Sequence, residues 1–112
     1  MHEMTIAQSI IELAEEVALK EDAGSIESID IEIGTFSGVV LESLAFAMEI
    51  AVKDTKLQKA RINYLEKAGI ACCNQCHTRF ETNDLLTLCP ECHKADIKII
   101  DGKQLKIKSL TI

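Results

Sequence analysis

Five cysteines fall in one short stretch of this 112-residue chain, and four of them form two spaced pairs. The pattern is Cys73-x-x-Cys76, twelve residues, then Cys89-x-x-Cys92. Two residues between cysteines let both sulfurs of a pair turn toward one point, and two such turns supply four thiolates in a tetrahedron, the geometry typical of structural Zn²⁺. The pattern therefore predicts a structural zinc site, closed because the protein supplies all four ligands.

Three residues next to the pairs leave alternatives open. Cys72 could replace Cys73 as a ligand, although Cys72-x-x-x-Cys76 makes a poorer turn. His77 and His93 follow the pairs, so both pairs also read Cys-x-x-Cys-His, the attachment signature of c-type haem, which needs an exported protein. Beside a zinc ion, the two histidines would either lie near the sulfurs or exchange with a cysteine when the pH changes.

A second group of metal donors stands at the start of the chain, Met1-His2-Glu3. The terminal amine, with a pKa of about 7.7–8.0, loses its proton easily near neutral pH. The amine, the deprotonated backbone amides of His2 and Glu3, and the His2 imidazole can close fused chelate rings. Four nitrogens in a plane favour Ni²⁺ or Cu²⁺ over Zn²⁺. The start thus predicts a second metal site, against the alternative of a solvent-exposed His2.

One helix and one strand stand out among the elements that must position these groups. A single apolar stripe is predicted from residues at helical spacing, namely Ile6, Ile10, Leu13 and Val17, with Ala7, Ala14 and Ala18 beside them. Thr5 and Gln8 fit a capping box, so we expect the helix to start near Thr5 and residues 1–4 to be loosely held. A half-buried strand is predicted from the alternation of apolar and acidic residues, namely Ile29, Asp30, Ile31, Glu32 and Ile33.

The remaining elements follow the same two patterns. A second helix is expected from about Val40 to Lys53 and a strand from Arg61 to Lys67. Leu105 and Ile107 alternate as in a final strand, but Leu110 falls on the other parity. A bulge or a change of packing partner would explain the slip.

These elements predict an α+β fold in which two helices pack on a small mixed β-sheet, with an inserted zinc-ribbon-like module. Helical periodicity vanishes between Gly69 and Gly102, where all the cysteines and the only proline lie. We therefore expect residues 1–69 and 102–112 to form one α+β domain and residues 70–101 to form the zinc-binding module.

The charge balance excludes one class of partner. The chain has 12 basic and 18 acidic side chains, a net charge of −6, whereas a nucleic-acid binder needs a basic face. No apolar run approaches the roughly 20 residues of a membrane span, and the start lacks a leader pattern. A cytoplasmic location is expected, where thiols stay reduced and cysteines bind metals before they form disulfides.

The sequence resembles the HypA/HybF family of hydrogenase nickel-incorporation proteins in three features. The chain opens Met1-His2-Glu3; its segment from Ile33 to Glu49, which contains Gly34-Thr35-Phe36-Ser37-Gly38, is similar to the family's central segment; and the four spaced cysteines match its zinc pattern. The features occur in the family's order and span nearly the whole chain.

The resemblance implies a nickel metallochaperone with an α+β nickel domain and a zinc domain inserted before the final strand. His2 and the amine of Met1 would bind nickel, with the amides of His2 and Glu3 completing the plane. Nickel would pass to the large subunit of a [NiFe] hydrogenase, with a HypB-type GTPase as partner. Some relatives also feed urease, so urease maturation proteins are further expected partners. We expect a monomer or a weak homodimer.

Two other classes of function compete with metal delivery. A four-cysteine ribbon also serves as a protein-interaction module in transcription or translation assemblies, but here it is nearly neutral and contains one aromatic residue, Phe80. An enzyme is the least supported, because the sequence shows no nucleophile–base pair, no phosphate-binding glycine loop and no open metal site.

Overall fold

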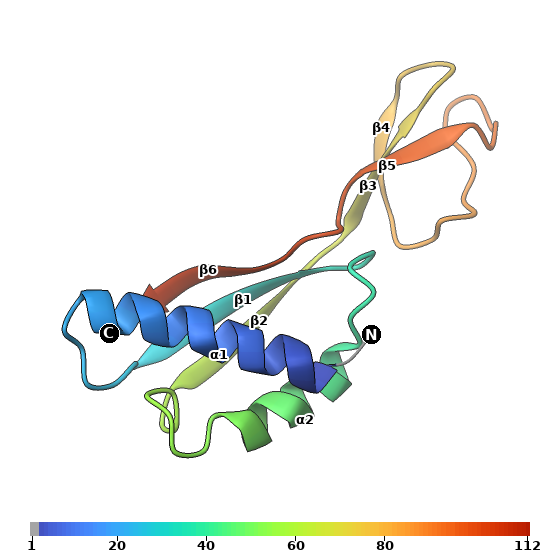
Figure 1. Ribbon diagram of the computed structural model, residues 1–112. Helices are drawn as coiled ribbons and strands as arrows, with labels where there is room; N and C mark the ends of the chain where they lie inside the picture. Colours follow the sequence, from blue (N-terminus) through green and yellow to red (C-terminus); the bar gives the residue numbers. More distant parts are fainter. Residues whose placement is uncertain (1–2) are drawn as a thin grey trace.

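The structure is a computed structural model that describes residues 3–112, drawn in Figure 1. Its elements, in chain order, are α1 (Glu3–Lys20), β1 (Ser28–Gly34), α2 (Leu41–Ala51), β2 (Arg61–Lys67), β3 (Gly69–Cys73), β4 (Arg79–Thr82), β5 (Ile97–Asp101) and β6 (Leu105–Thr111). The strands form two three-stranded sheets, β2-β1-β6 and β4-β3-β5. Two helices with two small sheets confirm the predicted α+β class.

We call the two helices and the sheet β2-β1-β6 the body, and the sheet β4-β3-β5 with its loops the module. In the body, β1 runs parallel to β2 and antiparallel to β6, so its sheet is mixed as predicted. Both helices lie on one face of this sheet (Figure 1). The module extends away from them, and the radius of gyration of 17.4 Å exceeds the roughly 13 Å of a compact domain of this length.

The centre of the body's core is the predicted strand β1. Ile29, Ile31 and Ile33 point to the helices and are at most 4% exposed, because alternate residues of a strand share a face. Leu44 and Met48 of α2 are fully buried against them. Val40 precedes α2 in an extended conformation, so the helix is shorter at both ends than the pattern predicted.

The prediction for α1 was wrong in its start and in two residues of its buried face, whereas Ile10 and the alanines beside the stripe are buried as expected. The helix begins at Glu3, so Thr5 lies inside it and is not a cap, and residues 3 and 4 are helical. The buried residues are Ala7, Ile10, Ile11, Ala14 and Ala18. Leu13 and Val17 are instead 55% and 46% exposed. The small alanine side chains let the helix pack closely against its neighbours, and this packing leaves the larger Leu13 and Val17 side chains at the surface.

The slip in the final strand is a bulge, one of the two explanations that the change of parity left open. Ile31 pairs with Ile107 and Asp30 with Ser109, so Lys108 is the extra residue and the register shifts between Asp30 and Ile31. The bulge lets both Ile107 and Leu110 pack against the core despite their opposite parities.

The face of β1 turned away from the helices is polar and internally paired. Glu32, only 6% exposed, lies between Lys67 of β2 and Lys106 of β6, with N–O distances of 3.7 and 3.4 Å. Asp30 accepts hydrogen bonds from the hydroxyl of Ser109 (2.6 Å) and the amide of Asn63 (2.8 Å). These contacts join the three strands on the face that no helix covers.

We expect Asp30→Asn to reduce stability at neutral pH and not in acid. The hydrogen bonds from Ser109 and Asn63 favour the carboxylate and lower the pKa of Asp30 below 3.8. Its contribution is therefore present above pH 3.8 and is lost as the pH falls through the lowered pKa. Urea unfolding at pH 7 and pH 3 measures this, and an equal difference from the native protein at both values would contradict it.

No helix within residues 3–112 is long and apolar enough to cross a membrane.

Candidate metal centre

Two similar turns bring the four spaced cysteines together. In the first, the backbone N–H of His77 donates to the carbonyl of Cys73 (3.0 Å); in the second, that of His93 donates to Cys89 (2.9 Å). His77 and His93 both have left-handed backbones, with φ of 63° and 61°. A residue in this conformation turns the chain back sharply. Each histidine is thus the residue that closes its turn, a backbone role that the sequence did not indicate.

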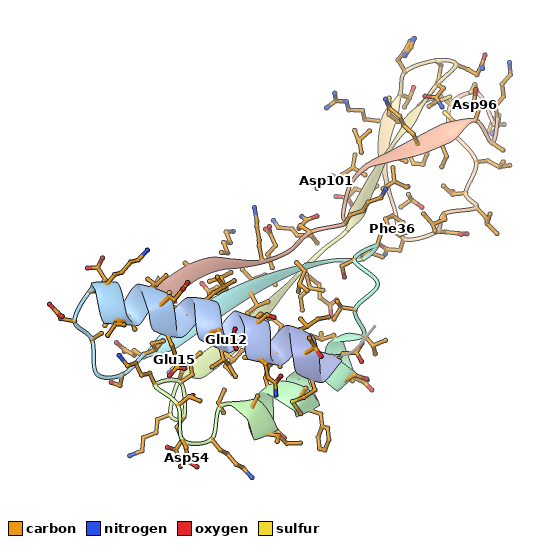
Figure 2. All side chains as sticks on the ribbon, in the orientation of Figure 1. Glu12, Glu15, Phe36, Asp54, Asp96 and Asp101 are labelled. Carbon is orange, nitrogen blue, oxygen red and sulfur yellow. The ribbon has the colours of Figure 1, made fainter. Side chains whose placement is uncertain are left out.

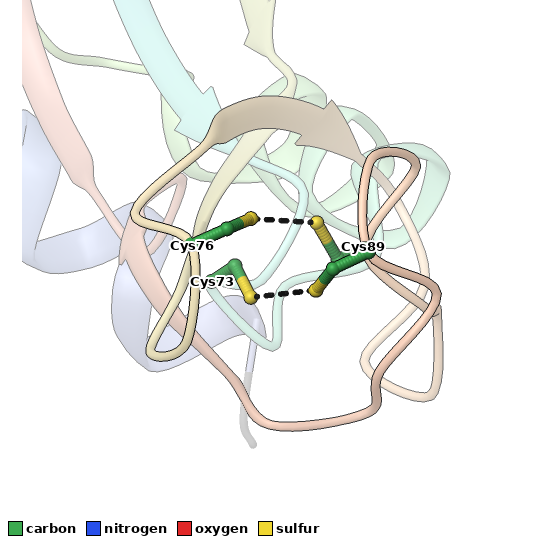
Figure 3. A group of neighbouring side chains, drawn as sticks. Cys73, Cys76 and Cys89 are labelled. Carbon is green, nitrogen blue, oxygen red and sulfur yellow. Dashed lines mark hydrogen bonds between the residues drawn. The ribbon is translucent and has the colours of Figure 1, made fainter.

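The sulfurs of Cys73, Cys76, Cys89 and Cys92 all lie within 4.8 Å of one another. Figure 3 shows the two turns facing each other, with Sγ–Sγ distances of 3.5 Å for Cys76–Cys89 and 3.4 Å for Cys73–Cys92. A Zn–S bond of about 2.3 Å gives a tetrahedron with S–S edges of about 3.8 Å. The donor set therefore fits a structural zinc ion in size and in chemistry.

Cys72 does not belong to this group of sulfurs. Neighbouring residues of a strand point to opposite faces, and Cys73 is fully buried whereas Cys72 is half-buried. The sulfur of Cys72 lies 3.7 Å from the carbonyl oxygen of Cys73. Cys72 and Cys73 thus point to opposite faces of β3, a strand that the sequence did not predict.

His77 and His93 are exposed, and neither imidazole joins the four sulfurs. Two hydrogen bonds instead favour the thiolate form of the first pair. The hydroxyl of Thr78, 3.2 Å from Cys76 Sγ, lowers the pKa of the Cys76 thiol to about 6. The backbone N–H of Gln75 lies 3.4 Å from Cys73 Sγ. Because the thiolate is the metal ligand, both contacts prepare the turn for a cation.

Asp96, which sequence reasoning missed, holds the first turn in place from the far side of the module. Its carboxylate accepts hydrogen bonds from the side-chain amides of Asn74 (2.9 Å) and Gln75 (2.8 Å), and its carbonyl accepts from the Asn74 backbone (2.8 Å). The two residues between Cys73 and Cys76 are thereby fixed. The pairing joins positions about twenty residues apart, and no local pattern indicates it.

Removing this carboxylate should therefore loosen the zinc site without removing a ligand. We expect Asp96→Ala to release zinc to a chelator severalfold faster, because the turn loses two exposed hydrogen bonds worth about 0.5–1.5 kcal/mol each. Glu91→Ala, which removes an exposed carboxylate from the second turn, is the matched control and should behave as the native protein. Equal release rates for the two variants would show that Asp96 does not stabilise the zinc site.

The second predicted metal site falls mostly outside the described residues. Met1 and His2 lie there, and Glu3 is the first residue of α1 and half-buried. Figure 1 places the start of α1 at the same end of the body as the start of α2, the end from which the module extends. Glu3 is the one residue of this predicted site that the structure positions.

Comparisons with known proteins agree over the whole chain. The family described as "Hydrogenase/urease nickel incorporation, metallochaperone, hypA" matches residues 1–112. A hydrogenase maturation factor HypA of Parabacteroides distasonis is 45% identical and one of Chlorobium limicola 36%, each over 100% of this chain and 97% of the relative. The solution structure of the Ni metallochaperone HypA from Helicobacter pylori is 26% identical, with a TM-score of 0.69 over 100% of this chain and 97% of the other.

Proposed function

Because the chain belongs to the HypA family of nickel-incorporation metallochaperones, we propose that it binds one Ni²⁺ at Met1, His2 and Glu3 and hands it to the large subunit of a [NiFe] hydrogenase. The family match over all 112 residues is the observation on which this rests. The chain is thus a nickel metallochaperone of hydrogenase maturation, and the site, the route and the recipient are the proposal.

The position of Glu3 supports a nickel site at the amino terminus. The first four N–H groups of an α-helix have no partner within the helix. Since α1 begins at Glu3, the helix does not use the amide N–H of Glu3, so this nitrogen can release its proton to solvent and bind a metal. The amine of Met1, the amide and imidazole of His2, and this nitrogen would form a plane suited to Ni²⁺.

A terminal site suits a carrier because it is accessible to the recipient. Deprotonated amides also make the affinity depend on pH, since metal binding must expel protons. The carrier therefore holds nickel more weakly as the pH falls. We propose residues 1–69 and 102–112, which contain the helices and the sheet of the body, as the nickel-binding domain, and residues 70–101 as the zinc-binding domain.

In the module, zinc bound by Cys73, Cys76, Cys89 and Cys92 would have a structural role. Four protein ligands leave no open position for a substrate, and the module's remaining apolar residues include the exposed Leu85, Leu86 and Leu88. When bound, zinc supplies a fixed tetrahedral cross-link between the two turns. This division of labour makes the protein a carrier and not an enzyme.

The partners in this proposal are a HypB-type GTPase and the hydrogenase large subunit. Residues 1–69 carry 13 acidic and 6 basic side chains, which favours docking of a basic surface near the nickel site. We place the handover in the cytoplasm, with the carrier as a monomer or weak homodimer. Urease maturation proteins are a second possible destination for the same cargo.

A transfer experiment tests the proposed delivery. Protein loaded with Ni²⁺ is mixed with the nickel-free large subunit and the two are separated, and nickel is measured on each. With a chelator present in both reactions, we expect the large subunit to acquire nickel faster from the loaded native carrier than from free Ni²⁺. The His2→Ala carrier should retain zinc and transfer no nickel. Transfer at equal rates from both carriers would contradict the proposal.

A further inference from the structure

Only two chain segments connect the body with the module. β2 ends at Lys67 and β3 begins at Gly69, and the chain returns between Asp101 at the end of β5 and Leu105 at the start of β6. Two such crossings would by themselves allow the module to swing. Any fixed angle between body and module must come from contacts around these crossings.

One turn of the body bonds to both crossings. The turn follows β1 and comprises residues 34–38. The backbone N–H of Thr35 donates to the carbonyl of Lys67 (2.9 Å), on the outgoing crossing. The backbone N–H of Phe36 donates to the carbonyl of Gly102 (2.7 Å), on the returning crossing. The turn therefore ties the two crossings together through its own backbone.

The ring of Phe36 adds a side-chain contact at the same place. A methyl group on Gly69 would overlap this ring, so the ring lies directly against the bare Cα of Gly69. Gly102, at a φ of 105°, would place a Cβ 2.6 Å from that same Cα. Glycine at both positions lets the two crossings and the ring meet at backbone distance. Figure 2 shows Phe36 at this junction, beside Asp101.

The turn also contacts the module beyond the crossings. The hydroxyl of Thr35 lies 3.0 Å from the carbonyl of Lys67 and 3.0 Å from Oδ1 of Asn83, and can donate to either. Asn83 follows β4 in the module. On its other side the turn continues through Val39 and Val40 into α2, which starts at the same end as α1 (Figure 1).

We propose that Phe36 is a positioning residue that locks the module at one angle to the body by seating its ring on Gly69. The zinc-bearing module and the end of the body where α1 begins are thereby held as one rigid unit. A partner that docks on the module is then held at a fixed distance and orientation from the start of α1. The segment Gly34–Gly38, which the resemblance singled out without a role, acquires one here.

Residual dipolar couplings of the zinc-loaded, nickel-free chain measure this angle directly. Amides of two rigidly joined parts obey a single alignment tensor, whereas parts that swing obey different ones. We expect the native body and module to share one tensor. In Phe36→Ala the tensor of the module should shrink relative to that of the body, because the module then reorients as hinged domains do.

Phe46→Ala is the matched control, because it removes a phenylalanine that is 65% exposed on α2, away from the junction. It should keep the shared tensor. Phe36→Leu retains apolar bulk on Gly69 and should give an intermediate result, and it decides the matter if Phe36→Ala loses its fold. A shared tensor in Phe36→Leu and Phe36→Ala, or two tensors in the native protein, would overturn the proposal. Nickel is absent throughout, so the outcome is independent of the nickel site.

Discussion

Acetylating the terminal amine of Met1 is expected to abolish tight nickel binding while leaving zinc untouched. The acetyl group turns the amine into an ordinary amide, so the chelate loses its terminal donor and gains no new amine. Loss of a mere partner of a ligand already costs about 10–100-fold in metal affinity, so displacing a ligand should cost more than that. Isothermal titration with Ni²⁺, on protein whose zinc content has been measured, gives the comparison.

His2→Ala should show the same loss, since it removes the imidazole from the same plane. The matched control is His77→Asn, because His77 is exposed in the module and Asn tolerates the left-handed backbone of the turn. It should bind nickel as the native protein does. If the protein acetylated at Met1 binds Ni²⁺ as tightly as the native one, the cargo is held elsewhere.

Cys73→Ala should remove zinc and unfold the module, whereas Cys72→Ala should do neither. The two cysteines are adjacent in sequence, yet only Cys73 lies in the group of four sulfurs. Zinc contributes about 10–16 kcal/mol to the folding of small structural sites at neutral pH. The module has too few buried side chains to fold without zinc. Among the residues that the structure describes, its buried apolar residues are Ala71, Cys73 and Cys89.

Zinc content and amide hydrogen exchange measure the two variants side by side. In Cys73→Ala, the amides of β3, β4 and β5 should exchange rapidly while those of β1 stay protected, because β1 belongs to the separate core of the body. Full zinc in Cys73→Ala, with loss in Cys72→Ala, would transfer the ligand to Cys72.

Local sequence patterns were sufficient to predict several of the strands. The alternation of Ile29, Ile31 and Ile33 predicted β1, and the strand from Arg61 to Lys67 has the expected bounds. The change of parity after Ile107 indicated either a bulge or a change of packing partner, and the structure has the bulge. Cysteine spacing alone predicted which four sulfurs gather, since the ligand geometry of zinc is a local constraint.

Long-range packing decided what the patterns could not. The alanines of α1 are buried because close approach to the sheet and α2 matters more than the size of Leu13 and Val17. The bonds of Asp96 to the first cysteine turn and the seat of Phe36 on Gly69 join segments far apart in the chain. No periodic pattern or motif within one segment predicts a contact with the other.

The ligands of nickel itself test the central claim most directly. X-ray absorption at the nickel edge, on zinc-loaded protein whose chain begins at Met1, reports the donor atoms and their geometry. Our account predicts a planar site of nitrogen donors that disappears in His2→Ala. Nickel with sulfur donors, on a protein whose first three residues are intact, would contradict it and would place the cargo on the cysteines.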